Sequence, residues 1–185
     1  MKCLNWPNRL SILRVLLIPV CVTLLQFEGA ACRIGALIVF CAAAFTDFLD
    51  GFIARKYQIV TNFGKFIDPV ADKLLVLSTM IALCGLSEFP AWACIVVLFR
   101  ELAVDGLRLV AAERGRVIAA GKLGKMKTAT QIVTLIIFLL DNRAYSAGGF
   151  TLGRAMVWLS VAMTLWSGAD YFYRNRAALK EGIQP

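Results

Sequence analysis

Four aspartates form two pairs on either side of one short connection in the first half of the chain. Asp47 and Asp50 are three residues apart, and Asp68 and Asp72 are four residues apart. Either spacing places both carboxylates of a pair on one face of a helix. Because the connection is short, the two helices should be antiparallel neighbours, so that the four carboxylates converge at one depth. Four converging carboxylates suit two divalent cations held roughly 3.5–4 Å apart, which would offset the repulsion among the four charges.

The expected metal follows from the ligands that the chain offers. The sequence contains no histidine, which excludes histidine-ligated zinc or haem and also Ser-His or Cys-His catalysis. Oxygen ligands favour hard ions, so two Mg2+ or Mn2+ ions are expected. The alternative is a solvated helix end at which the aspartates pair with neighbouring cations, but it does not explain the face-to-face spacing. The cations available for such pairing are Arg55, Lys56, Lys65 and Lys73.

Small and basic residues surround the aspartates. Gly51 removes a side chain next to Asp50, and Gly64 does the same across the connection, so a ligand can approach the backbone closely. Ala54 is small on the face of the first pair, and Arg55 can bind a phosphate through two parallel hydrogen bonds. Each feature alone is also explained by close helix packing in a membrane. Together they predict a site for a metal-bound diphosphate.

The elements that position these residues are predicted to be membrane-spanning helices. Of the 185 residues, 59% are hydrophobic and 17% are charged, which departs from a typical soluble domain. Several apolar blocks reach the roughly 20 residues that cross about 30 Å of hydrocarbon as a helix. We therefore predict an all-α, polytopic membrane protein with six transmembrane helices, one domain over 1–185, and a short interfacial segment at 1–9. The expected spans are 11–27, 31–54, 68–87, 91–112, 127–141 and 150–173.

The distribution of charge predicts the orientation in the membrane. Basic residues concentrate at the N-terminus, in the second-to-third and fourth-to-fifth connections, and in the C-terminal tail. The positive-inside rule then places both termini and these connections in the cytoplasm. The net charge of +8 is explained by such loops facing anionic headgroups, and not by nucleic-acid binding. The six cysteines show no close pairs and are interpreted as small buried hydrophobic residues.

A second group of charged residues lies within the fourth predicted span. Arg100 and Arg108 are accompanied by Glu101 and Asp105, and helical spacing spreads the four over one side. Arginines inside a membrane usually face the bundle interior or a water-filled cavity. One interpretation is a set of internal salt bridges, Arg100 with Glu101 and Arg108 with Asp105. The other is that the arginines bind an anionic acceptor while the acids hold their side chains in place.

The entry to the fifth predicted span is also basic. Lys122, Lys125 and Lys127 lie in the run GKLGKMKTATQ. Alone, this run is explained as a positively charged flank on the cytoplasmic side. Beside Arg100 and Arg108 it indicates a phosphate-binding cluster, because an acceptor that carries its own phosphate needs several cations, whereas serine or choline does not.

The aspartate segment resembles a known family. The run Asp47-x2-Asp50-Gly51-x2-Ala54-Arg55-x8-Gly64-x3-Asp68-x3-Asp72 matches the signature of the CDP-alcohol phosphotransferases at every defined position. The six-span layout also resembles this family over nearly the whole chain. The runs RELAVDGLR and GKLGKMKTATQ, together with the opening PNRLSILRVLLIP, are most similar to the bacterial phosphatidylglycerophosphate synthases.

The resemblance implies a reaction, a location and roles for particular residues. It implies transfer of the phosphatidyl group of CDP-diacylglycerol to sn-glycerol 3-phosphate, giving phosphatidylglycerophosphate and CMP, at the bacterial inner membrane. Asp47, Asp50 and Asp68 would bind one ion, Asp47, Asp68 and Asp72 the other, with Asp72 as general base. The implied CDP-lipid ligands are Asn8, Gly51, Ala54, Arg55 and Gly64. The resemblance, with the apolar faces of the third and fourth spans, leaves a homodimer open.

Three other functions compete with this reading. A sibling transferase would use another acceptor, such as inositol phosphate or serine. A transporter that relays ions through intramembrane carboxylates predicts charges along a crossing path, whereas the four aspartates cluster near one face. A non-catalytic membrane scaffold leaves the aspartate spacing unexplained.

Overall fold

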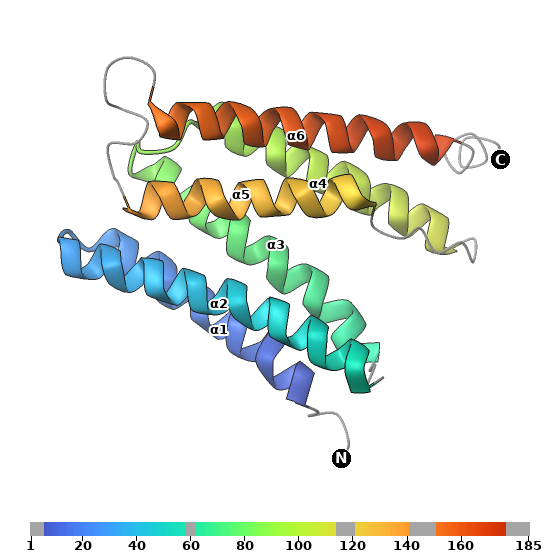
Figure 1. The fold of residues 1–185 in the computed structure, drawn as a ribbon, viewed down its shortest axis with the longest axis horizontal. Helices are drawn as coiled ribbons and strands as arrows, with labels where there is room; N and C mark the ends of the chain where they lie inside the picture. Colours follow the sequence, from blue (N-terminus) through green and yellow to red (C-terminus); the bar gives the residue numbers. More distant parts are fainter. Residues whose placement is uncertain (1–5, 58–61, 114–120, 141–150, 177–185) are drawn as a thin grey trace. The chain divides into compact units, whose positions relative to one another are not determined.

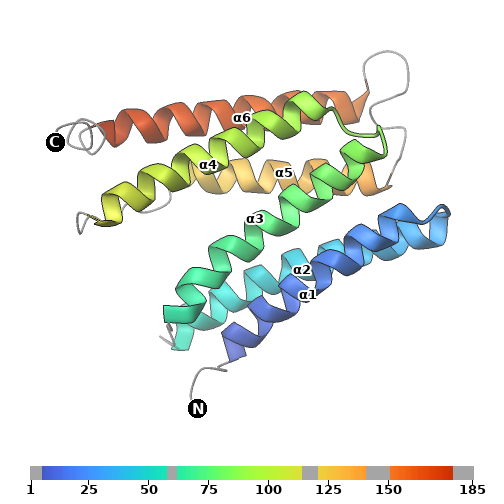
Figure 2. The same cartoon turned by 180° about the vertical axis from the view of Figure 1, so that it is seen from behind.

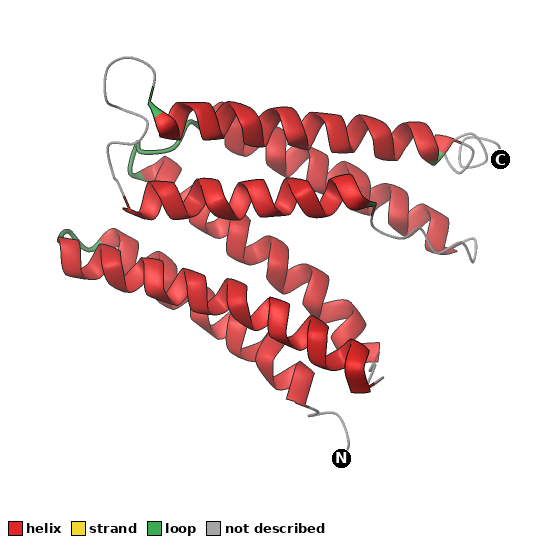
Figure 3. Cartoon of the chain, in the orientation of Figure 1, coloured by secondary structure: helices red, strands yellow, loops and turns green. Residues whose placement is uncertain are grey.

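The chain folds into helices joined by short connections. The computed structural model describes the backbone of residues 6–57, 62–113, 121–140 and 151–176, and the side chains within 11–46, 70–112, 121–140 and 151–176. Over these ranges it contains six helices and no strand (Figures 1 and 3). The helices are α1 (Trp6–Gln26), α2 (Ala30–Tyr57), α3 (Asn62–Gly85), α4 (Ala91–Glu113), α5 (Lys122–Leu140) and α6 (Leu152–Arg174). The predicted all-α class is confirmed.

Each predicted span corresponds to one helix, and the ends differ in two informative places. α1 begins at Trp6, so the last residues of the expected interfacial segment continue the first helix. Pro7 is tolerated there because the first turn of a helix has no use for its missing N–H group. α3 begins at Asn62, well before the apolar block that predicted it. Hydropathy locates the apolar part of a helix, whereas polar residues at its end can be equally helical.

The chain forms two compact units. Unit 1 comprises residues 1–89 and 135–146 and contains α1, α2, α3 and the last residues of α5. Unit 2 comprises residues 90–134 and 147–185 and contains α4, most of α5 and α6. Within unit 1, α1 contacts both α2 and α3, and α2 also contacts α3 (Figure 2). Fully buried small residues, including Ala36, Ala43 and Ala71, allow these helices to approach closely.

Arg33 of α2 holds one end of unit 1 together. Its guanidinium pairs with both carboxylate oxygens of Glu88, at 2.9 and 2.6 Å. The same group donates to the backbone carbonyls of Leu139, at 3.1 Å from Nε, and of Phe138. These carbonyls belong to the last turn of α5, where backbone acceptors have no partner within the helix. The Phe138 ring also packs edge-on against Phe89, with centroids 5.1 Å apart.

Unit 2 combines apolar packing with buried polar contacts. α4 packs against α6 around Val104, Leu107 and Tyr171. Between α5 and α6, Gln131 Nε2 donates to Thr164 Oγ1 at 3.2 Å, and Thr134 Oγ1 donates to the Met156 carbonyl at 3.3 Å. Hydrogen bonds of this kind join helices where the hydrophobic effect cannot, as in a bilayer.

One described helix, Lys122–Leu140, is long and apolar enough to cross a membrane by length and composition. Ser11–Gln26 and Ala30–Thr46 are shorter apolar stretches among the described residues. The apolar stretches expected from the composition are therefore present in α1, α2 and α5. The polytopic arrangement itself stays a prediction.

Candidate active site

The four aspartates lie on two consecutive helices at matching distances from their connection. Asp47 and Asp50 precede the end of α2 at Tyr57, and Asp68 and Asp72 follow the start of α3 at Asn62. At about 1.5 Å per residue, each pair lies roughly 9–15 Å along its helix from the connection. Both pairs are thus inside helices, as the spacing argument requires. The side chains of Asp47, Asp50 and Asp68 lie outside the described residues, so their convergence stays a prediction.

The predicted CDP-lipid ligands belong to the same two helices and to α1. Asn8 is on α1, Gly51, Ala54 and Arg55 are on α2, and Gly64 is on α3. Their side chains also lie outside the described residues. All of these positions and the four aspartates belong to unit 1.

Asp72 is held by a residue whose role the sequence did not reveal. Its Oδ1 accepts a hydrogen bond from Arg14 Nη1 of α1, and the two groups form an ion pair. Arg14 is completely buried, whereas the Asp72 side chain is 37% exposed. A buried guanidinium that reaches a partly exposed carboxylate ties α1 to α3 and orients that carboxylate. The signal in the sequence was a charged residue in the middle of an apolar span, which usually marks a functional position.

The four aspartates offer carboxylate ligands that suit the predicted metal ions. The contacts of the described residues do not test this prediction. Among the residues whose side chains are described, no three acidic or sulfur ligands gather as a metal site. That range includes Asp72 and omits its three proposed co-ligands. Carboxylate oxygen is the donor that hard divalent ions prefer. The donor set therefore fits Mg2+ or Mn2+.

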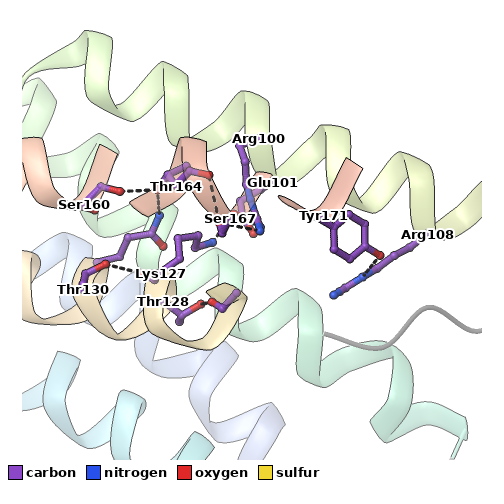
Figure 4. Close-up of polar contacts among 12 residues, drawn as sticks. Arg100, Glu101, Arg108, Lys127, Thr128, Thr130, Ser160, Thr164, Ser167 and Tyr171 are labelled. Atoms are coloured by element: carbon purple, nitrogen blue, oxygen red, sulfur yellow. Dashed lines mark hydrogen bonds and ion pairs between the residues drawn. The ribbon is translucent and has the colours of Figure 1, made fainter. Parts of the chain in front are cut away.

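A buried charge cluster joins α4 to α5 in unit 2 (Figure 4). Glu101 Oε1 accepts from Lys127 Nζ and from Arg100 Nη1, the latter at 3.1 Å. Lys127 is only 3% exposed and Glu101 only 7%. Ionised groups are buried at this level only when they are paired. Because two cations share one carboxylate, the cluster carries a net positive charge and suits an anionic ligand.

Arg100 also has an atom that no described residue satisfies. Its Nη2 donates to Ser167 Oγ of α6 at 3.1 Å. Its Nε is buried and has no hydrogen-bond partner among the described residues. A buried N–H without a partner is costly, and this one lies against α6, 3.8 Å from the position of a Cβ atom at Gly168.

Arg108 lies further along α4 and meets α6 as well. Its Nε donates to the Tyr171 hydroxyl at 3.1 Å, and its Cζ lies 5.4 Å from the centre of the Tyr171 ring. Of the two salt bridges considered from the sequence, the Arg100–Glu101 pair is present. For Arg108, the contact that the structure defines is with Tyr171.

The predicted acceptor-phosphate residues therefore divide into two sets. Arg100 and Lys127 are brought together around Glu101, and Arg108 lies on the same helix as Arg100. Lys122 and Lys125 are exposed in the first turn of α5, before Lys127. Sequence reasoning missed Ser167 and Tyr171, whose only signal was their spacing of four residues on one face of an apolar helix.

Sequence comparison identifies the family to which this chain belongs. The family model for CDP-alcohol phosphatidyltransferases matches residues 4–166. The chain belongs to this family, and the expected resemblance is confirmed. It is accordingly a transferase of phospholipid metabolism, and its family indicates association with a membrane.

Three similar proteins carry names that specify a reaction or a product within this family. The CDP-diacylglycerol–glycerol-3-phosphate 3-phosphatidyltransferase of Bacillus subtilis (strain 168) is 42% identical over 188 residues, covering 95% of this chain and 97% of the relative. The protein of the same name from Rickettsia typhi is 36% identical, covering 91% and 95%. A probable phosphatidylglycerophosphate synthase of Mycobacterium tuberculosis is 37% identical, covering 92% and 81%.

Proposed function

We propose that this chain transfers the phosphatidyl group of CDP-diacylglycerol to sn-glycerol 3-phosphate, which releases CMP and forms phosphatidylglycerophosphate for anionic phospholipid synthesis. Family membership supports the reaction class, and the relatives named for this reaction support the substrates. The observation that carries the choice of acceptor is the buried cluster of Arg100 and Lys127 around one carboxylate. Its net positive charge suits an acceptor that brings its own phosphate.

The acceptor phosphate would be bound by the basic residues of α4 and α5. Arg100 contributes its positive charge, and Arg108 offers a planar guanidinium that can bind a phosphate through two donors. Lys127 adds a charge that Glu101 keeps in place. Lys122 and Lys125, exposed at the start of α5, would draw the anion toward the site.

The aspartates would hold two Mg2+ or Mn2+ ions, Asp47, Asp50 and Asp68 binding one and Asp47, Asp68 and Asp72 the other. When bound, these ions neutralise the diphosphate and the charge that develops on the leaving CMP. Asn8, Gly51, Ala54, Arg55 and Gly64 would bind the CDP part of the lipid.

The reaction exchanges one phosphorus–oxygen bond for another. The acceptor hydroxyl oxygen bonds to the lipid-side phosphorus, the bond from that phosphorus to the bridging oxygen breaks, and CMP leaves with that oxygen. The hydroxyl proton passes to the Asp72 carboxylate, whose orientation Arg14 controls.

We also propose that the chain spans the bacterial inner membrane several times, with both termini and the site on the cytoplasmic side. The exposed surfaces of both units support a lipid environment. On α4, Ile95, Phe99, Leu102 and Leu109 are exposed at helical spacing along one face. On α1, Leu13, Leu16 and Val20 form a similar exposed face. Contiguous apolar surface of this kind marks contact with a membrane or another protein.

The decisive experiment measures CMP release from CDP-diacylglycerol by the purified chain in detergent, with Mg2+ or Mn2+ and a panel of acceptors. Release only with sn-glycerol 3-phosphate is the expected result. Release with inositol phosphate or serine instead would assign the chain to a sibling transferase. No release with any acceptor, for a protein that runs as a folded species on size exclusion, would overturn the proposal.

A further inference from the structure

α6 supplies the contacts that hold both arginines of the proposed acceptor site. Ser167 Oγ donates its single proton to the Thr164 carbonyl at 3.1 Å. The hydroxyl therefore presents only acceptor capacity toward Arg100, whose Nη2 donates to it at 3.1 Å. The serine is 3% exposed, so this contact is shielded from water. It fixes the direction of the guanidinium of Arg100.

Gly168 provides room for the same arginine. A Cβ atom at this position would lie 3.2 Å from Arg100 Cγ and 3.8 Å from its Nε. The first distance is tighter than ordinary van der Waals contact. The aliphatic stem of Arg100 thus lies directly against the backbone of α6, and any larger residue at 168 must displace it.

Tyr171 holds Arg108 as Ser167 and Gly168 hold Arg100. Tyr171 is 7% exposed and packs with Val104, Leu107 and Phe172, which holds its hydroxyl in place. That hydroxyl accepts from Arg108 Nε at 3.1 Å, and the centre of the ring lies 5.4 Å from Arg108 Cζ. An arginine held through Nε keeps its outer edge, the two Nη groups, available as a fork for a phosphate. Figure 4 shows both arginines reaching from α4 to labelled residues of α6.

We propose that Tyr171 is a positioning residue for the acceptor, together with Ser167 and Gly168, and that α6 forms a third wall of the acceptor-phosphate site. Tyr171 aims Arg108, and the Ser167–Gly168 pair aims Arg100, so that α6 sets the direction of both guanidinium groups. This inference rests on the proposed function. It adds to that function the element that sets the geometry of acceptor binding.

The test compares Tyr171→Phe with Tyr173→Phe in the full chain in detergent. Tyr173 lies on the same helix, is 69% exposed and contacts Arg176 through its ring, so its hydroxyl provides a matched control. Loss of one hydrogen bond to a charged group predicts that Tyr171→Phe raises the KM for sn-glycerol 3-phosphate about tenfold. The KM for CDP-diacylglycerol should remain within about twofold of wild type, and Tyr173→Phe should change neither.

Two results would overturn the inference while wild type remains active with sn-glycerol 3-phosphate. One is a Tyr171→Phe enzyme that matches the Tyr173→Phe control. The other is an equal change in both KM values, which indicates a packing role. Inactive wild type would instead contradict the proposed function.

A double-mutant cycle with Arg108→Ala separates positioning from direct binding. If Tyr171 acts through Arg108, adding Tyr171→Phe to Arg108→Ala should leave the KM for sn-glycerol 3-phosphate unchanged within about twofold. A further independent rise of about tenfold would show that the hydroxyl acts on its own and would overturn the assignment. Because phenylalanine keeps the buried ring, this variant retains the packing with Val104 and Leu107.

Discussion

Two charged regions of the molecule differ in how their charges are balanced. One is the aspartate region of α2 and α3, and the other is the basic region of α4, α5 and α6. The four aspartates lie within 47–72, close in sequence, and carry charges of one sign. The basic region gathers Arg100, Lys127 and Ser167 from three separate helices and includes its own counter-ion, Glu101. In the first region Arg14 pairs with Asp72 and the proposed metal ions would balance the remaining carboxylates, whereas the second region is partly neutralised by its own carboxylate. This difference predicts that substitutions in the aspartate region mainly reduce turnover, whereas substitutions in the basic region reduce stability or raise the KM for the acceptor.

The largest effect is expected in the aspartate region. Asp68→Asn should reduce CMP release by more than about 100-fold, because a carboxylate ligand affects metal binding at least as strongly as the residues around it. The protein should still run as a folded species in detergent. Asp170→Asn is the control, since Asp170 pairs with the exposed Arg174 on α6. Near-normal turnover by Asp68→Asn would remove this residue from the metal site.

Glu101→Gln should instead destabilise the protein. The substitution leaves Arg100 and the buried Lys127 without their shared negative charge, and breaking a buried ion pair costs about 3–5 kcal/mol. Thermal unfolding in detergent should show a clear loss relative to Asp170→Asn. Inorganic phosphate or sn-glycerol 3-phosphate should restore more stability to this variant than to wild type, because an anion replaces the missing charge. An unfolding temperature equal to wild type would contradict the role of Glu101 as internal counter-ion.

Arg14→Lys addresses the contact between Arg14 and Asp72 in the aspartate region. A lysine keeps the charge but loses the planar donor geometry with which Arg14 holds Asp72. We expect kcat to fall about tenfold at saturating substrates, with little change in the KM for sn-glycerol 3-phosphate. Steady-state kinetics with each substrate varied in turn would measure both constants. A selective rise in the acceptor KM would place Arg14 with the basic region.

The smallest effect is expected from Gly168→Ala. The added methyl group meets Arg100 Cγ at 3.2 Å and must push the arginine aside by a few tenths of an ångström. A displacement of this size should raise the KM for sn-glycerol 3-phosphate about threefold, equivalent to ~0.7 kcal/mol. Gly106→Ala on α4 is the matched control, because a Cβ there meets nothing within 4 Å. Equal kinetics for the two alanine variants would show that Arg100 adjusts without consequence.

Most of the fold could be predicted because apolar blocks and helix spacing are local properties. All six predicted spans coincide with helices, and the starts of α1, α3 and α5 lie earlier than predicted because polar residues continue a helix beyond its apolar part. In the aspartate region, the pairs 47/50 and 68/72 lie on helices as their spacing required. In the basic region, the sequence indicated Arg100, Arg108 and Lys127 by type, but not their partners on α6.

The sequence by itself determined the helices, the shared faces of the two aspartate pairs, and the match to the CDP-alcohol phosphatidyltransferase family. Helical periodicity and a short connection are enough for these conclusions, because they relate residues that are near one another along the chain. Only the tertiary structure decided that Arg14 meets Asp72, that Glu101 is shared by Arg100 and Lys127, and that Tyr171 holds Arg108. The physical reason is that spacing along a helix shows which residues share a face, whereas the packing of distant helices selects what that face contacts.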